Sequence, residues 1–157
     1  MAADVLTLTV PRTTYYLALV RRLVADVARR AGFNEIEIGE IEVAVDEVAT
    51  RAVAHRFGEG LATHDILVVE ARTEDGELEI TLRDHAARAR KTDSADEIDF
   101  NDVAKEYDLG GFDEFVVKTF MDEVEFTHRA SVGNELRMVR RLPVGRMALG
   151  GVRVAAT

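Results

Sequence analysis

Three ionisable side chains recur at intervals of four residues in one segment of this chain: Glu47, Arg51 and His55. In a helix such residues lie on one face, one turn apart. A carboxylate on that face can act as a general base towards a bound hydroxyl group. The same spacing also fits a structural role, because Glu47 and Arg51 can form an ion pair worth about 0.2–0.5 kcal/mol. A histidine near a helix end is, in the same way, more often a capping or packed group than a base.

The segment that carries these residues, 41–57, is predicted to be a buried helix. Its opposite face is apolar at helical spacing, and no glycine or proline interrupts it. The apolar stripe consists of Ile41, Ala44, Val45, Val48, Ala49, Ala52 and Val53.

The composition indicates a single globular domain without disulfides. The chain has 157 residues, 47% of them hydrophobic, and no cysteine. It contains no run of about 18 apolar residues and no secretion signal, so we expect a cytoplasmic protein that neither spans nor binds a membrane. A net charge of −9 argues against direct binding to nucleic acid. One exception is a helix face with Arg21, Arg22, Arg29 and Arg30, which could meet an acidic protein partner.

The remaining pattern predicts strands in adjacent pairs with helices grouped between them. The order suggests an α+β fold: a two-layer α/β sandwich with a mostly antiparallel mixed sheet and helices on one face. We expect residues 85–108 to form a lid or loop, residues 1–142 to form the single domain, and residues 143–157 to be a tail that is either flexible or adds an edge strand. The predicted strands are 5–10, 65–72, 76–83, 124–128 and 135–141. Three helices are predicted: the first is capped by Thr13 or Thr14 and ends at Ala31, the second follows Asn34, and the third spans 112–120.

The run 44–55 resembles the nucleotide-binding helix of the anti-sigma factor serine kinases of bacterial partner-switching systems. These belong to the ATPase superfamily of DNA gyrase, the large heat-shock chaperones and the sensor histidine kinases. The resemblance implies that Glu47 is the catalytic carboxylate, which activates the attacking hydroxyl group. Arg51 stands where the family has the asparagine that holds magnesium. The family residues that the chain keeps are Ala44, Glu47, Thr50, Ala52 and His55.

A second motif of that family is aspartate-x-glycine at the end of a central strand. The resemblance implies that its carboxylate accepts the adenine amino group and that its glycine lets the backbone approach the ring. This chain has Asp84 at the first position and Ala86 at the second. An added methyl group hinders close approach of the backbone.

The third motif is a glycine-rich turn that leads into a helix and cradles the phosphates. Gly110 and Gly111 are present, and the helix ends in the family's Met-Asp-Glu-Val at residues 121–124. Asp113 and Glu114 replace a glycine and a leucine, which places two carboxylates where the polyphosphate binds. We hypothesise that Arg51 pairs with Asp113 or Glu114 across the former site, in place of magnesium and phosphate. The alternative is that Arg51 contacts the ATP phosphates directly, as a fixed cation.

The resemblance covers residues 6–142 and implies a regulatory protein that binds a sigma factor or its anti-anti-sigma antagonist, with a homodimer expected. The altered motifs lead us to expect no cofactor and no metal, and a pseudokinase with impaired or absent ATP binding. One alternative is an active ATP- and magnesium-dependent serine/threonine kinase with an unconventional site, and another is a switch subunit that activates a phosphatase. The expected nucleotide-site positions are Glu47, Arg51, Asp84, Ala86, Gly110, Gly111 and Asp113.

Overall fold

The computed structural model describes residues 2–54, 66–85, 112–129 and 133–146. The predicted strands and helices all form, with bounds that differ by a few residues at most. The part of the helix predicted beyond residue 54, with His55, and the predicted lid lie outside the described residues, apart from His85 at the end of the third strand. The elements are β1 (Asp4–Pro11), a 3-10 turn (Thr14–Tyr16), α1 (Leu17–Ala31), α2 (Glu35–Ala54), β2 (Ile66–Glu74), β3 (Glu77–His85), α4 (Phe112–Phe120), β4 (Glu123–Arg129) and β5 (Gly133–Arg141).

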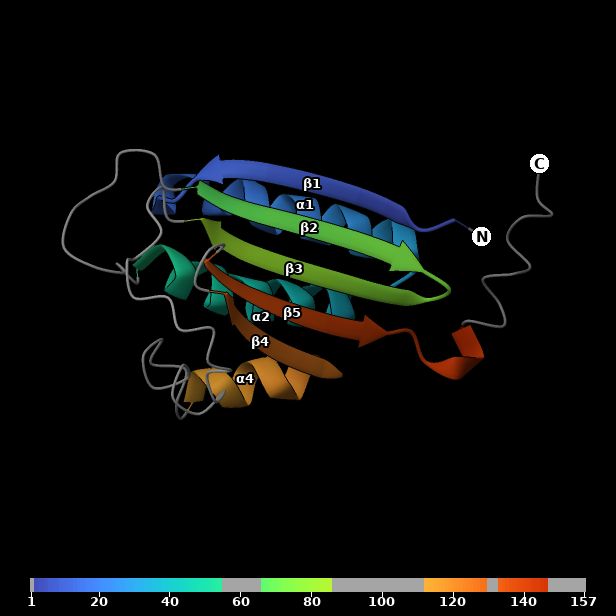
Figure 1. Ribbon diagram of the computed structural model, residues 1–157. Coiled ribbons are helices and arrows are strands. Elements are labelled where there is room, and N and C mark those ends of the chain that lie inside the picture. The colour runs from blue at the N-terminus through green and yellow to red at the C-terminus, as the bar shows by residue number, and fades with distance from the viewer. Residues whose placement is uncertain (1, 55–65, 86–111, 130–132, 147–157) are drawn as a thin grey trace.

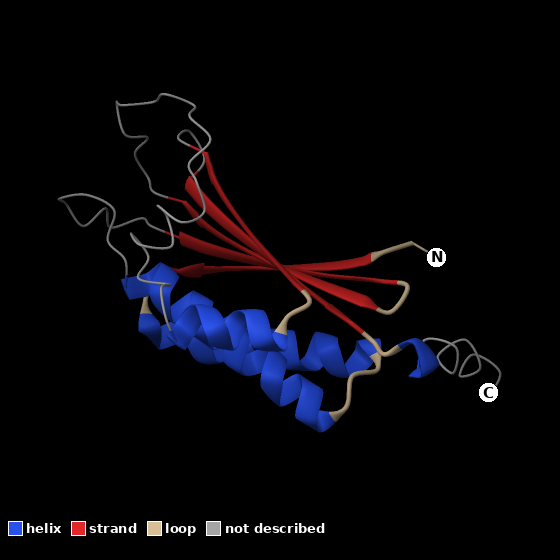
Figure 2. Ribbon diagram, turned by 90° about the horizontal axis from the view of Figure 1, so that it is seen from below, coloured by secondary structure: helices blue, strands red, loops and turns tan. Residues whose placement is uncertain are grey.

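The five strands form one sheet in the order β1-β2-β3-β5-β4 (Figure 1). The helices α1, α2 and α4 all lie on the same side of that sheet, and no described helix covers its other side (Figure 2). The predicted α+β two-layer sandwich is therefore confirmed. The sheet was expected to be mixed, but every pairing between the described strands is antiparallel.

Local sequence signals fix the ends of these elements. The Thr13 hydroxyl oxygen accepts a hydrogen bond from the Tyr15 amide at 3.2 Å, and Gly32 ends α1 at a φ of 102°, a conformation that favours glycine. Between β2 and β3, Asp75 and Gly76 form a two-residue turn in which both φ angles are positive, at 47° and 79°. Asp-Gly is a preferred sequence for this turn.

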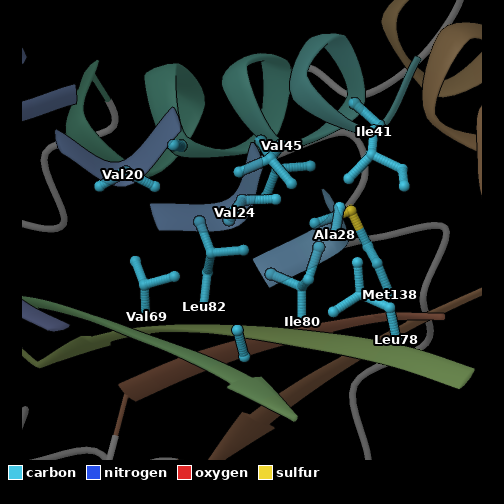
Figure 3. Close-up of a cluster of buried hydrophobic side chains, with 14 of the residues drawn as sticks. Val20, Val24, Ala28, Ile41, Val45, Val69, Leu78, Ile80, Leu82 and Met138 are labelled. Carbon is cyan, nitrogen blue, oxygen red and sulfur yellow. The ribbon is translucent and has the colours of Figure 1, made fainter. Parts of the chain in front are cut away.

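The core lies between the sheet and the helices (Figure 3). Successive strand residues point to opposite faces, so every second residue of β3 meets the helices. Burying one such aliphatic side chain contributes roughly 1.5–3 kcal/mol. The fully buried side chains at the centre include Val20 and Val24 of α1, Ile41 and Val45 of α2, Leu78 and Ile80 of β3, and Met138 of β5.

The open face of the sheet carries arginines that lie between carboxylates of neighbouring strands. Val139 of β5 also belongs to this face, because its neighbour Met138 points into the core, and yet Val139 is fully buried. Its cross-strand neighbours are Glu79 and Glu123, so long charged side chains shield it from water. Arg83 contacts Glu70 at 3.5 Å and Glu135 at 2.6 Å, and Arg137 contacts Glu79 at 2.7 Å and Glu123 at 3.1 Å.

The expected basic face of α1 is less basic than its sequence suggests. Three of its four arginines form ion pairs, with N···O distances of 2.8 to 3.0 Å. The fourth arginine of this face is Arg22, for which the described residues show no ion pair. Among the helices of the described ranges, none is both long and apolar enough to cross a membrane. The three pairs are Arg21 with Asp46, Arg29 with Glu35, and Arg30 with Asp26.

Candidate functional site

The sheet register brings several strand ends together at one end of the molecule. Pro11, the last residue of β1, pairs with Ile66, the first residue of β2, and Ile66 also pairs with His85 at the end of β3. Asp84 pairs with Asn134 at the start of β5. In Figure 1, α2 ends and α4 begins at this same end. The elements that carry the predicted nucleotide-site positions therefore converge here.

Glu47 and Arg51 lie one turn apart in the C-terminal half of α2, and both are half-buried. Ala44 and Val48, each three residues before one of them, are buried beside them on the helix surface, so Glu47 and Arg51 lie at the margin of the buried stripe. The expected ion pair between Glu47 and Arg51 is not among those of the described residues, although Arg51 is not without a partner.

Asp84 is buried at the end of β3. It follows Leu82 by two residues, so it lies on the side of the sheet that faces the helices. Its carboxylate lies 3.8 Å from a guanidinium nitrogen of Arg12, and the two side chains are only 4% and 7% exposed. A charge this deeply buried needs an opposite charge nearby, because it has lost its hydration. The neighbouring guanidinium of Arg12 provides this opposite charge.

Arg12 was not predicted as a site residue. It follows Pro11, where β1 ends, and the chain turns there with a hydrogen bond of 2.8 Å from the Thr13 amide to the Pro11 carbonyl oxygen. An arginine just after a strand that ends in proline looks like an ordinary surface residue. Only the pairing of β1 and β3 with β2 between them shows that Arg12 reaches Asp84.

The other predicted positions are less fully placed. Ala86, Gly110 and Gly111 lie outside the described residues. Asp113 and Glu114 belong to the first turn of α4, but their side chains are not among those described. The hypothesis that Arg51 pairs with Asp113 or Glu114 therefore concerns side chains outside the described part of the structure.

The donor set limits what these residues can bind. A guanidinium carries only N–H donors and no acceptor lone pair, so Arg51 cannot supply the oxygen ligand that Mg²⁺ requires. The Asp84 carboxylate, which would accept an amino group, already lies against a cation. Among the described positions, the residue that departs from the chemistry of the family is thus Arg51, whereas Asp84 keeps its carboxylate.

Comparison with known proteins identifies the family. A family model described as the histidine kinase-like ATPase domain matches residues 10–140. The serine-protein kinase RsbW of Listeria monocytogenes serovar 1/2a is 30% identical over 135 residues, which cover 82% of this chain and 83% of that protein. RsbW of Bacillus cereus strain AH187 is 26% identical over 122 residues, which cover 76% and 74% of the two chains.

A solved structure has a similar fold. It contains the RsbU and RsbW domains of Rv1364c from Mycobacterium tuberculosis, and it superposes with a TM-score of 0.61 at 18% sequence identity. The match covers 88% of this chain and 32% of that longer one. Together with the α+β sandwich and the retained motif residues, these similarities show that the chain belongs to the histidine kinase-like ATPase family, as a member of its anti-sigma factor kinase branch.

Proposed function

We propose that this chain is a partner-switching regulator that holds a sigma factor or the antagonist of one, and that it neither binds Mg·ATP in the ordinary way nor transfers phosphate. The curated relatives are called serine-protein kinases and are 30% and 26% identical to this chain. The observation that carries the second half of the proposal is Arg51, a half-buried cation on α2 at the position of the metal ligand.

A fixed positive charge at this position opposes metal binding in two ways. It removes an oxygen ligand, and it repels a divalent cation at short range. Glu47, one turn earlier, keeps the carboxylate that would activate a hydroxyl group. Without a bound nucleotide that carboxylate has no phosphoryl group to direct the hydroxyl towards. Regulation then depends on competition between partners, or on a separate kinase that modifies the antagonist.

We also propose that the chain forms a homodimer through β1. This strand lies at the edge of the sheet, with one neighbour, β2. Two apolar side chains on it, Val5 and Leu6, are 52% and 43% exposed. An exposed edge of this kind favours pairing with another strand, because its backbone groups lack partners within the sheet. Light scattering on wild type and on Val5→Lys, which places a charge on this exposed edge, tests this: the variant is expected to be monomeric.

Two measurements test the main proposal. Calorimetric titration with ATP, with and without Mg²⁺, is expected to show no heat beyond dilution. Affinity purification of the tagged chain from its native host, followed by mass spectrometry, is expected to recover a sigma factor or a small antagonist protein. Recovery of neither class would contradict the regulatory role.

A phosphorylation assay separates this proposal from an active kinase. The recovered antagonist is incubated with the chain and radiolabelled ATP, and no labelled serine is expected. Labelling that disappears in Glu47→Ala would instead establish a working kinase with an unconventional site. Labelling that persists in Glu47→Ala would indicate a contaminating kinase, and the assay would then be repeated with protein purified from another host.

A further inference from the structure

We propose that the outward face of the N-terminal half of α2 is a docking surface for a basic amphipathic helix of another protein. The surface consists of Ile36, Gly39 and Val43, which share one face of the helix because they lie three and seven residues apart. It is called the α2 stripe below. It is separate from Glu47 and Arg51, which lie nearer the other end of α2, so the proposal does not depend on whether ATP binds.

The α2 stripe is apolar and open to solvent. Ile36 is 76% exposed and Val43 is 45% exposed, whereas Ile41 and Val45, on the opposite face of the helix, are fully buried. A helix that packs on a sheet needs one apolar face, and the rest of its surface is usually polar. α2 thus has a second apolar face, which the described part of the chain leaves largely exposed.

Gly39 lies in the interior of α2, between the two exposed apolar residues of the stripe. A glycine in a helix interior costs stability relative to alanine, and its usual reasons are missing here. Gly39 is not among the glycines with positive φ, and a Cβ atom added to it would meet nothing within 4 Å. No contact in the described chain therefore requires a glycine at this position. The absence of a side chain does, however, let the backbone of another helix approach α2 closely.

Carboxylates border the α2 stripe on both sides, and α2 contains no basic residue before Arg51. Arginines of α1 and β5 pair with three of these carboxylates. Exposed ion pairs of this kind contribute little free energy, so basic groups of a partner can share them. Glu42 forms no ion pair within the described residues. The bordering carboxylates are Glu35, Glu42 and Asp46 on the side of α1, and Glu40 on the other side.

These charges favour a basic partner over a second copy of the chain. Each copy has a net charge of −9, and a two-fold contact through the α2 stripe would bring the carboxylates of both copies together. A helix with apolar residues at intervals of three and four, flanked by lysine or arginine, instead matches the stripe in shape and in charge. One of its apolar side chains can fill the space above Gly39.

The first test measures the fluorescence anisotropy of a labelled peptide that has leucine at every third or fourth position and lysine elsewhere. Gly39→Gln places a side chain in the stripe and keeps a residue that favours helix. It is expected to bind the peptide about tenfold more weakly than the full wild-type chain does. Glu125→Gln introduces the same side chain on the open face of the sheet, where Glu125 is 65% exposed, and is expected to bind like wild type. A peptide with glutamate in place of lysine is expected to bind wild type at least about tenfold more weakly.

Equal affinities of wild type and folded Gly39→Gln for the basic peptide would overturn the proposal, and so would a failure of wild type to bind it. Circular dichroism shows whether each variant folds. Ile36→Ser is the second variant, because Ile36 is exposed in the free chain and its loss leaves the core unchanged. It is expected to weaken binding about tenfold, since it removes an apolar side chain that the partner would bury. An unchanged affinity for Ile36→Ser would equally contradict the proposal.

The second test identifies the occupant in the native host. A photoreactive phenylalanine derivative replaces Val43, and mass spectrometry determines the sequence of the segment that is cross-linked to it. A segment of another protein with apolar residues at helical spacing and an excess of lysine and arginine is expected. Cross-linking to a second copy, to residues 147–157 of the chain itself or to an acidic segment would overturn the proposal, as would the absence of any cross-link. A sigma factor or antagonist that is recovered with the chain but cross-links elsewhere would leave the proposed function in place and reject the α2 stripe.

Discussion

Arg146 donates two hydrogen bonds to the carboxylate of Glu37, which lies 109 residues earlier in the chain, one of them at 2.6 Å. The same carboxylate accepts a hydrogen bond from the backbone amide of Asn34 at 2.8 Å, and the side-chain oxygen of Asn34 accepts one from the backbone amide of Glu37 at 2.9 Å. This reciprocal pair is the capping box that begins α2. Glu37 thus fixes the start of the helix that carries Glu47 and Arg51, and attaches to it the turn that follows β5. Residues 143–146 of the predicted tail are therefore joined to the domain.

The first prediction concerns pH. The pKa of Glu37 is lowered, chiefly by the hydrogen bonds from Arg146, with burial acting in the opposite direction. A carboxylate with a lowered folded-state pKa stabilises the fold above its unfolded pKa of about 4.3, and this stabilisation is lost as the pH falls through the folded value. Glu37→Gln is expected to lower the free energy of unfolding by about 1.5–3 kcal/mol at pH 7. Because the variant lacks this titrating group, its free energy of unfolding is expected to fall less steeply with decreasing pH than that of wild type.

Chemical denaturation between pH 7 and pH 3 measures this effect. Glu35→Gln is the matched control, because Glu35 lies in the same helical turn but pairs with Arg29 at the surface. The pKa of Glu35 is also lowered, chiefly by its hydrogen bond with Arg29. Solvent screens this exposed pair, so the control is expected to depart from the wild-type pH dependence less than Glu37→Gln does. Equal slopes for wild type and Glu37→Gln below pH 4.3 would show that Glu37 does not contribute to the acid sensitivity.

Two glycines give the second prediction. Gly39 lies within α2, and a Cβ atom added there would meet nothing within 4 Å. Gly39→Ala is expected to stabilise the protein by about 0.5–1 kcal/mol, because alanine loses less backbone entropy in a helix. Gly32→Ala is expected to destabilise it by about 1 kcal/mol, because Gly32 adopts a φ of +102°. Thermal melts that shift in the same direction for both variants would contradict this account.

The third prediction compares two isoleucines on one helix. Ile41 is fully buried between α2 and the sheet, whereas Ile36 is 76% exposed. Ile41→Ala is expected to lower the free energy of unfolding by about 2–5 kcal/mol, because it removes buried methyl groups and leaves a cavity. Ile36→Ala is expected to change it by less than about 0.5 kcal/mol. Urea titration measures both, and a large loss for Ile36→Ala would show that this side chain is covered, for example in a dimer.

The sequence predicted the features of this fold that depend on neighbouring residues. Asn34, Thr13 and Gly32 mark helix ends through their own side chains or backbone freedom, and Asp75-Gly76 marks a turn in the same way. The alternation of Leu78 with Glu79 shows which residues of β3 face the helices. Such signals need no knowledge of the rest of the fold.

The long-range ion pairs could not be predicted. With 20 basic and 29 acidic residues, many pairings are compatible with the sequence, and the register of the sheet selects among them. The contact of Arg12 with Asp84 requires β1 and β3 on either side of β2, and that of Arg146 with Glu37 requires the end of β5 near the start of α2. Val139 was expected on a strand, but its burial under charged side chains depends on the residues of β3 and β4 beside it. The candidate site was therefore predicted as a set of positions, without the cation that lies against Asp84.

The fourth prediction concerns the two positions at which the family's ligand chemistry has changed. Arg51→Asn restores an amide oxygen on α2 that can ligate Mg²⁺, but it leaves Asp113 at the position that is a glycine in the phosphate-binding turn of the family. A carboxylate there repels the polyphosphate, and a residue with a side chain hinders close approach of the backbone. Arg51→Asn alone is therefore expected to bind Mg·ATP no better than wild type, whereas Arg51→Asn/Asp113→Gly is expected to bind it with a measurable, magnesium-dependent heat in calorimetric titration. Asp113→Gly alone is the control and is expected to bind Mg·ATP no better than wild type, because Arg51 still offers no oxygen ligand. Restoration by Arg51→Asn alone would show that Asp113 does not face the phosphates, and failure of the double variant would place the obstacle at a further position, such as Ala86, instead.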